Sequence, residues 1–263
     1  MFSLRLECGD AAKDLLTAML WEAGTAGITE HEFPGGRWEL EAFFDKEFDL
    51  SPFAPYHPRW KQAASTDWLE VSRAMWEPLP VGERFYLVPE WREDAAPAGR
   101  VRLTVHPGLA CGTGYHAATQ LALCAMERHL VAGSSFLDVG TGSGILSEAA
   151  LLLGADRVTA CDIDYEAARI ARCNLGPRAT VSLFCGSVRS VRTRSFETVA
   201  ANLNAQSLLA LMADLERVCR GTLILSGITE RDVKVVQAAI HSVPVSGLLE
   251  QDEWRCIVLR SAG

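Results

Sequence analysis

The chain has 263 residues, 49% of them hydrophobic, and a formal net charge of −8. This length and apolar content allow a full hydrophobic core, and we expect one large domain together with a small one. No apolar run reaches the roughly 18 residues of a membrane span, and the eight cysteines have no Cys-x-x-Cys or paired Cys/His spacing. The composition therefore argues against a membrane anchor, a metal site and a disulfide framework, and we expect a cytoplasmic monomer.

The negative charge is concentrated in the first part of the chain. Residues 1–100 contain ten Lys and Arg against eighteen Asp and Glu, whereas residues 101–263 contain fifteen of each. Nucleic-acid binding requires the opposite sign, so we expect no direct nucleic-acid partner. An acidic part of the chain would attract a basic macromolecule, although the same charge serves solubility equally well.

The first part of the chain shows a β-α-β-β pattern. The predicted elements are a strand over 2–8, a helix over 10–22, strands over 26–33 and 37–44, and a proline-rich loop over 50–57. This order fits a small ferredoxin-like α+β domain, which we assign to residues 1–65. A connecting helix is predicted over 66–78, ending where prolines begin.

The second part, residues 79–263, alternates strands with helices. Short strands are predicted over 85–89 and 101–105, and core strands over 136–139, 154–162, 181–184, 198–203, 222–226, 245–250 and 255–260. Helices are predicted over 119–130, 143–153, 165–174, 206–219 and 229–241. This alternation, closed by a hairpin, predicts an α/β fold with a mostly parallel seven-stranded sheet and an antiparallel last strand.

A glycine-rich turn follows the first core strand. The apolar strand stops at Gly140, Gly142 and Gly144, and a helical pattern begins at Ser143. Glycine lets the backbone approach a ligand closely, and the free N–H groups of a helix start favour a negatively charged group. Asp162 closes the next strand, where such a unit presents a carboxylate to ribose hydroxyls. This arrangement predicts a nucleotide-type cofactor site.

The spacing of the glycines argues against a dinucleotide. A dinucleotide fingerprint requires Gly or Ala three places after its second glycine, and this chain has Ile145 or Ser147 there. Asp138, ahead of the glycines, suits a ligand with a cationic amino-acid end. The pattern Asp138-x-Gly-x-Gly-x-Gly144 resembles the first motif of S-adenosylmethionine-dependent methyltransferases.

A more specific resemblance lies just before this strand. The loop Gly108-Leu-Ala-Cys-Gly-Thr-Gly-Tyr-His116 leads into a helix that carries Thr119. Together with Asp162-Ile-Asp164, Val199-Ala-Ala-Asn202 and Glu253-Trp254, it resembles the PrmA family in order and spacing. That family methylates the eleventh protein of the large ribosomal subunit. The resemblance is strong over residues 80–263 and looser before them.

The resemblance implies a class I methyltransferase fold, Rossmann-like, with S-adenosyl-L-methionine as cofactor. It places the family's cofactor contacts on Thr119, Gly140, Asp162 and Asn202, to which the first motif adds Asp138, Gly142 and Gly144. The small domain would then recognise a basic protein substrate, expected to be a ribosomal protein. We interpret Asp164 as the N-cap of the following helix rather than as a ligand residue.

Two residues are candidates for catalysis. The amide of Asn202, at the carboxyl end of the fourth strand, could orient an incoming lysine or α-amino group. His116 is a candidate general base, although a lone loop histidine is more often structural and solvent could take the proton.

The departures from the family pattern concern the substrate more than the chemistry. Tyr115 replaces a threonine, Cys111 replaces a phenylalanine, and Thr141 stands between the first two glycines. The alternatives are a methyltransferase for another protein or a small molecule, and a cofactor-binding adaptor without turnover.

Overall fold

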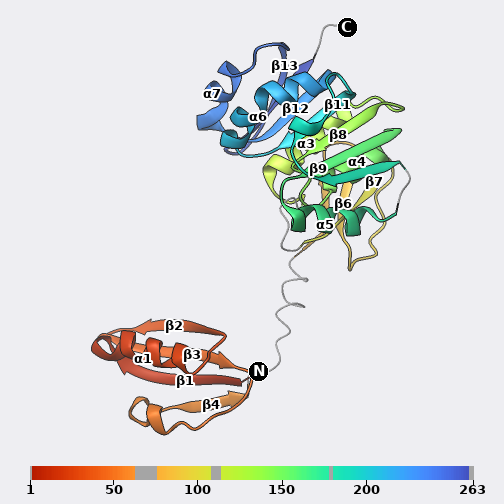
Figure 1. Ribbon diagram of the computed structural model, residues 1–263. Coiled ribbons are helices and arrows are strands. Elements are labelled where there is room, and N and C mark those ends of the chain that lie inside the picture. Colours follow the sequence, from red (N-terminus) through yellow and green to blue (C-terminus); the bar gives the residue numbers. More distant parts are fainter. Residues whose placement is uncertain (1, 63–75, 108–113, 178–179, 261–263) are drawn as a thin grey trace. The chain divides into compact units, whose positions relative to one another are not determined.

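The computed structural model describes residues 2–62, 76–107, 114–177 and 180–260 (Figure 1). It divides into two compact units, Met1–Met75 and Trp76–Gly263. Most of the connecting helix predicted over 66–78 lies outside the described residues, and residues 76–78 have no regular structure. Each unit has its own hydrophobic core.

The first unit consists of one helix packed on a four-stranded antiparallel sheet of order β2-β3-β1-β4 (Figure 1). Its elements are β1 (Phe2–Gly9), α1 (Asp10–Glu22), β2 (Gly27–Phe33), β3 (Arg37–Phe44), the 3-10 helix η1 (Ser51–Tyr56) and β4 (Arg59–Gln62). The ferredoxin-like prediction is confirmed, with η1 in place of a second α-helix. The prediction of a loop over 50–57 is wrong, because most of this stretch forms η1. Pro52 fixes a helical φ at the start of this 3-10 helix.

The core of the first unit lies between α1 and one face of this sheet. Leu4, Leu6 and Leu40 of the strands and Leu16 and Leu20 of α1 are fully buried. Leu16 and Leu20 lie four residues apart and therefore on the same side of the helix.

An aromatic cluster extends this core beside η1. Phe44 lies 4.7 Å from Phe48 and 5.7 Å from Trp60, and Phe48 lies 5.2 Å from Trp60, all between ring centroids in edge-to-face geometry. Phe53 of η1 joins the cluster at 6.0 Å from Phe48. Such pairs contribute roughly 0.5–1.5 kcal/mol each beyond the area they bury. The rings therefore stabilise the sheet where a second helix is replaced by a short turn.

The second unit is built on a seven-stranded sheet of order β10-β9-β8-β11-β12-β14-β13. Its strands are β8 (Ser135–Val139), β9 (Arg157–Asp162), β10 (Val181–Cys185), β11 (Phe196–Asn202), β12 (Cys219–Thr229), β13 (Val245–Gln251) and β14 (Trp254–Arg260). The pairs from β10 to β12 are parallel, and β14 runs antiparallel to both β12 and β13. The predicted sheet is confirmed.

Helices cover both faces of this sheet (Figure 1). They are α3 (Ala117–His129), α4 (Ile145–Leu152), α5 (Tyr165–Leu175), α6 (Ala205–Val218) and α7 (Val233–Ala238), with the 3-10 helices η2 (Val188–Ser190) and η3 (Glu230–Asp232). Successive β8 residues point to opposite faces: Phe136 packs with α3 and α4, and Leu137 packs with α6. The helix predicted over 229–241 is shorter in the structure, where the 3-10 helix η3 leads directly into α7.

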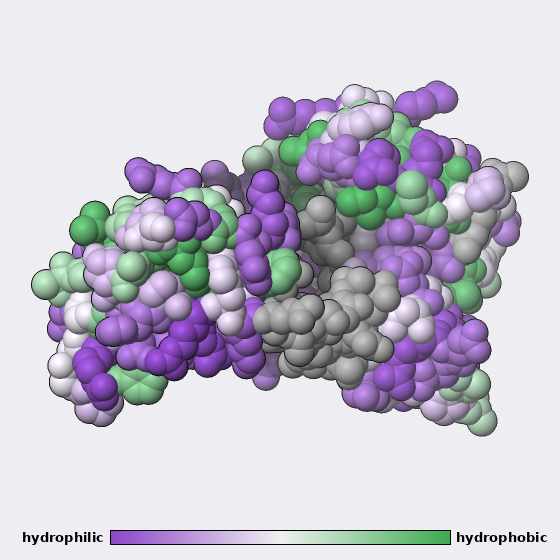
Figure 2. Space-filling view, turned by 90° about the horizontal axis from the view of Figure 1, so that it is seen from below, coloured by the Kyte–Doolittle hydropathy of each residue, from purple (hydrophilic) through white to green (hydrophobic). Residues whose placement is uncertain are grey.

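A small three-stranded sheet packs against the α3 and α4 side. It consists of β5 (Leu79–Val81), β6 (Phe85–Pro89) and β7 (Val101–Val105), and its apolar side chains share one core with α3 and α4. In the view of Figure 2, hydrophilic residues cover most of both units and apolar residues form only small groups. Among the described residues, no helix is long and apolar enough to cross a membrane.

Candidate functional site

The glycine turn joins β8 to α4 through a left-handed backbone. Gly140 has a φ of 73°, Gly142 of 53° and Gly144 of 87°, values that favour glycine. A Cβ on Gly140 would collide with the side chain of Leu203. The helix starts at Ile145 rather than at Ser143, because Gly144 is left-handed and serves as its N-cap.

Asp162 braces this turn from the end of β9. Its Oδ2 accepts a hydrogen bond from the Gly142 N–H at 3.0 Å, and its Oδ1 accepts one from the Asp164 N–H at 3.0 Å. The carboxylate is thereby held in one orientation at the carboxyl edge of the sheet. Asp164 itself caps α5 by accepting from the Glu166 N–H at 2.9 Å, as predicted.

A cavity of about 640 Å³ opens at this edge of the sheet, beyond the carboxyl ends of β8 to β11. It is lined by Gly140, Gly142, Asp162 and Asn202 of the predicted site, and by residues that follow β9, β10 and β11, among them Ile163, Ser187, Leu203 and Ser207. Ligands of open α/β sheets bind at this edge. The cavity therefore brings together four of the residues singled out from the sequence.

Thr119 lies behind Asn202 rather than in the cavity lining. Its side chain, on the first turn of α3, is 1% exposed, and its Oγ1 accepts a hydrogen bond from the Asn202 Nδ2 at 3.1 Å. This bond uses one of the two N–H donors of the Asn202 amide, and Asn202 itself lines the larger cavity.

Asp138 lies beneath the glycine turn and does not line the cavity. It is 1% exposed, and its Oδ2 accepts from the Thr141 hydroxyl at 2.7 Å and from the Ser147 N–H and hydroxyl at 3.1 and 2.7 Å. Burial raises the pKa of Asp138 to about 6, against the effect of these hydrogen bonds. In this structure Asp138 ties the turn to the first turn of α4.

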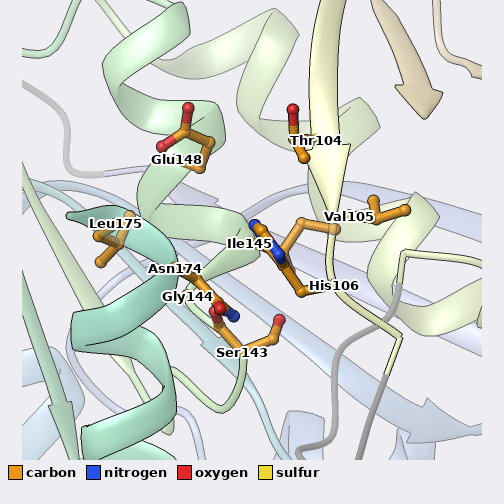
Figure 3. Close-up of a pocket in the computed structure, with 9 residues that line it drawn as sticks. All are labelled: Thr104, Val105, His106, Ser143, Gly144, Ile145, Glu148, Asn174 and Leu175. Atoms are coloured by element: carbon orange, nitrogen blue, oxygen red, sulfur yellow. The ribbon is translucent and has the colours of Figure 1, made fainter. Parts of the chain in front are cut away.

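Gly144 faces a second, smaller cavity on the other side of the turn (Figure 3). This cavity of about 180 Å³ lies between the end of β7, the start of α4 and the end of α5. The sticks in Figure 3 show His106 from the β7 side, with Asn174 and Leu175 from α5 around the glycine. Its volume is below the roughly 300 Å³ of common ligand sites, so the larger cavity is the candidate cofactor site.

His116 is the N-cap of α3. Its Nδ1 accepts a hydrogen bond from the Ala118 N–H at 3.3 Å, and its ring packs edge-to-face on Trp254 at 4.5 Å. The Nδ1 lone pair of His116 is thus used by the cap. His116 does not line the larger cavity.

The residues that depart from the family loop are only partly described. Cys111 lies outside the described residues. The Tyr115 hydroxyl donates to the backbone oxygen of Glu77 at 2.5 Å, and its ring packs edge-to-face on Trp76 at 4.6 Å. Tyr115 thus anchors the end of this loop to the segment before β5.

The family model described as "Ribosomal protein L11 methyltransferase (PrmA)" matches residues 39–262. The chain belongs to this family. A protein named ribosomal protein L11 methyltransferase from Cupriavidus taiwanensis is 35% identical over 250 residues, covering 89% of this chain and 83% of that protein. One from Ralstonia pickettii is 36% identical, covering 83% and 73%.

A solved structure agrees with these sequence relatives. The ribosomal protein L11 methylase from Lactobacillus delbrueckii subsp. bulgaricus superposes with a TM-score of 0.63 at 31% identity, covering 70% of this chain and 98% of that chain. The class I methyltransferase fold inferred from the resemblance is thereby confirmed.

The residues of the larger cavity fit the S-adenosyl cofactor that membership of this family implies. Its volume lies within the roughly 300–1,000 Å³ of ligand sites. Each oxygen of Asp162 uses one lone pair on a backbone N–H and keeps another for a ribose hydroxyl. Ile163, whose exposed fraction is 80%, offers an apolar surface at the rim.

Sequence reasoning missed the part of this cavity that follows β10. Gly186 and Ser187 line it, and so does Leu203 after β11. The signal available in the sequence was the rule that ligands bind at the carboxyl edge of the sheet, which placed Asn202 and could have been applied to the glycine two residues after the strand predicted over 181–184. Leu203 had no such signal, since an apolar residue after a buried strand normally indicates core packing.

Proposed function

We propose that this protein is an S-adenosyl-L-methionine-dependent methyltransferase that methylates amino groups, on lysine or at the α-amine, of ribosomal protein L11. One observation carries the proposal. In a chain of this family, a nucleoside-sized cavity at the carboxyl edge of the sheet is lined by Gly140, Asp162 and Asn202 together.

The protein's part in catalysis is alignment. When bound, the cofactor supplies a methyl group activated by a positively charged sulfur. Asp162 would hold the ribose through the free lone pairs of its carboxylate, and Gly140 would let the backbone approach the methionyl part. Positioning of this kind can account for a large share of a rate enhancement, because the reacting groups are oriented before they react.

Asn202 would orient the acceptor amine. Its Nδ2 donates to Thr119, which would fix the amide so that its Oδ1 can accept from the amine. An amide oxygen accepts from an N–H and leaves the nitrogen lone pair of a neutral amine free for attack. Thr119 acts in this scheme as a positioning residue.

The proton of the incoming ammonium must leave before attack. His116 could take it only by giving up its N-cap contact, because that contact occupies the lone pair of Nδ1. Solvent is the other acceptor. A substitution that keeps the cap while removing the base separates the two routes.

The substrate would be recognised by residues 1–65, joined through 66–78 to a methyltransferase domain over 79–263. The first 100 residues carry the whole net charge of −8, which suits a basic ribosomal protein. We place the reaction in the cytoplasm, with the enzyme acting as a monomer. Light scattering of the purified protein checks the last point.

The deciding experiment is methyl transfer to purified ribosomal protein L11. The chain is incubated with isotope-labelled S-adenosyl-L-methionine, and the acceptor is digested and analysed by mass spectrometry for methylated lysine or α-amine. Asp162→Ala serves as the inactive control. Labelling of another protein in a cell lysate, with none on L11, would indicate a different acceptor. Cofactor binding without any labelled acceptor would indicate an adaptor.

A further inference from the structure

A groove lined by arginines lies at the edge of the sheet opposite the cofactor cavity. Arg157 begins β9, and residues 192–195 precede β11. Both strands run parallel to β8, so both begin at the amino edge of the sheet. The groove has a volume of about 530 Å³ and is lined by Arg157, Thr159, Val191, Arg192, Thr193, Arg194, Ser195 and Phe196.

The three arginines of this groove are exposed and have no acidic partner in the described part of the chain. The neighbouring arginines, in contrast, form ion pairs. Arg189 and Arg217 both pair with Asp214, and Arg220 pairs with Glu197. The positive charge of the groove is therefore available to a ligand.

Arg157 is held in place at the groove wall. Its guanidinium lies 5.7 Å from the centroid of the Phe196 ring, and its Nη2 donates to the Ser195 backbone oxygen at 3.4 Å. Stacking on an aromatic face fixes the plane of a guanidinium while leaving other N–H groups free. A fixed guanidinium loses less conformational entropy when it binds an anion.

The turn that carries the other two arginines is fixed but strained. Arg194 has a φ of 50°, a left-handed conformation that is unfavourable for a residue other than glycine. Its N–H donates to the Arg217 backbone oxygen at 2.8 Å, and the Ser195 N–H donates to that of Val218 at 3.0 Å. Glycine would adopt this conformation without strain, and residues kept under strain cluster at functional sites.

We propose that this groove, defined by Arg157, Arg192 and Arg194, is a phosphate-binding site that takes the sugar-phosphate backbone of RNA. Guanidinium groups match phosphate oxygens in a bidentate fork, and the hydroxyls of Thr159 and Thr193 add neutral donors. Phe196, the only aromatic residue of the lining, is buried and lies under Arg157. The groove therefore lacks a free ring on which a base could stack, which favours binding of phosphates without sequence preference.

This site is independent of the cofactor cavity and of the acidic first unit. The expectation against nucleic acid rests on the charge of residues 1–100, whereas the groove belongs to the second unit, whose formal charge from residue 101 onward is balanced. β9 separates the two edges by six residues, about 20 Å at 3.3 Å per residue. Cofactor and RNA can therefore occupy the unit together.

The test is fluorescence anisotropy of a labelled single-stranded RNA of about 16 nucleotides, titrated with the full-length protein. Three phosphate contacts predict a slope of log K against log salt of about −2, from 0.7 × 3. Arg192→Glu with Arg194→Glu is expected to weaken binding about tenfold or more and to bring the slope to about −0.7. The matched control is Arg231→Glu with Lys234→Glu, two exposed cations of η3 and α7 with the same change in charge. It should leave binding nearly unchanged.

A second variant uses the strain at Arg194. Arg194→Gly should raise the midpoint of thermal unfolding or leave it unchanged, while it weakens RNA binding. Isothermal titration with inorganic phosphate separates RNA from a small phosphate compound. Suppose that phosphate binds to the wild type and not to the double variant, and that RNA binds to neither. The groove is then a phosphate-binding site for a small ligand and not for RNA. Absence of binding by both, equal losses in the control, or full binding by Arg194→Gly would overturn the proposal.

Discussion

Asp162 and Asp164 lie two residues apart, and each receives a backbone hydrogen bond, yet we expect very different effects of their removal on cofactor affinity. Asp162→Ala removes a carboxylate that lines the larger cavity and accepts from the Gly142 and Asp164 N–H groups. Asp164 also lines this cavity, but its Oδ1 is committed to the cap of α5, where it accepts from the Glu166 N–H, and Asp164→Ala removes that cap. Both changes delete one negative charge, so long-range electrostatics is matched between them.

The expected magnitude follows from these contacts. Two hydrogen bonds from ribose hydroxyls to a carboxylate contribute about 1.5 kcal/mol each, and their loss corresponds to a dissociation constant raised roughly 100-fold. Displacement of the Gly142 turn adds to this loss. Asp164→Ala should lower the free energy of unfolding by about 1 kcal/mol, as for other N-caps, and change affinity by less than about threefold.

Isothermal titration with S-adenosylhomocysteine measures the affinities, and urea denaturation measures the stabilities. Asp162→Asn should fall between wild type and Asp162→Ala, because its amide oxygen keeps one acceptor while its nitrogen faces a backbone N–H. Equal losses of affinity in Asp162→Ala and Asp164→Ala would refute the assignment of the ribose to Asp162.

Three further outcomes follow from the described contacts. Glu127→Ala removes the acceptor of the exposed Glu83 and Arg84 N–H groups and should lower the free energy of unfolding by about 0.5–1.5 kcal/mol, as measured by urea denaturation. Asp138 has a pKa raised to about 6, so its contribution to stability is complete below pH 4 and is lost as pH rises through about 6. The free energy of unfolding of the wild type, measured relative to that of Asp138→Asn, should therefore fall over that interval in denaturation curves at several pH values. His116→Asn keeps an N-cap acceptor and should retain both the melting temperature and methyl transfer. His116→Ala should lower the free energy of unfolding by about 1 kcal/mol. A His116→Asn variant that folds and binds the cofactor but transfers no methyl group would make His116 the base.

Local signals in the sequence predicted the elements well. The cap at Asp164 depends only on an acid directly before a helical pattern, and the structure shows it. The glycine turn and the acid after the next strand likewise lie close together along the chain. The turn and the acid lie together at the carboxyl edge of the sheet because their strands are parallel, and the alternation of strands and helices predicts that parallel arrangement.

Features that depend on exact conformation or on contacts between distant elements were harder to predict. The start of α4 was placed two residues early, because the left-handed φ of Gly144 cannot be read from a helical pattern. The sequence does not show that the turn folds back over Asp138, so that Thr141 and Ser147 donate to its Oδ2, and the assignment of Asp138 to the cofactor stays a prediction. The contact of Thr119 with Asn202 joins residues 83 positions apart and required the structure.

The strand order of the first unit has a consequence for how this protein is synthesised. β1 is made first, yet it lies between β3 and β4 in the finished sheet. One of its edges must therefore stay open until residue 62 has left the ribosome, and unpaired edges invite association with other chains. A nascent chain stopped before β4 should depend on chaperones far more than one released a few residues later.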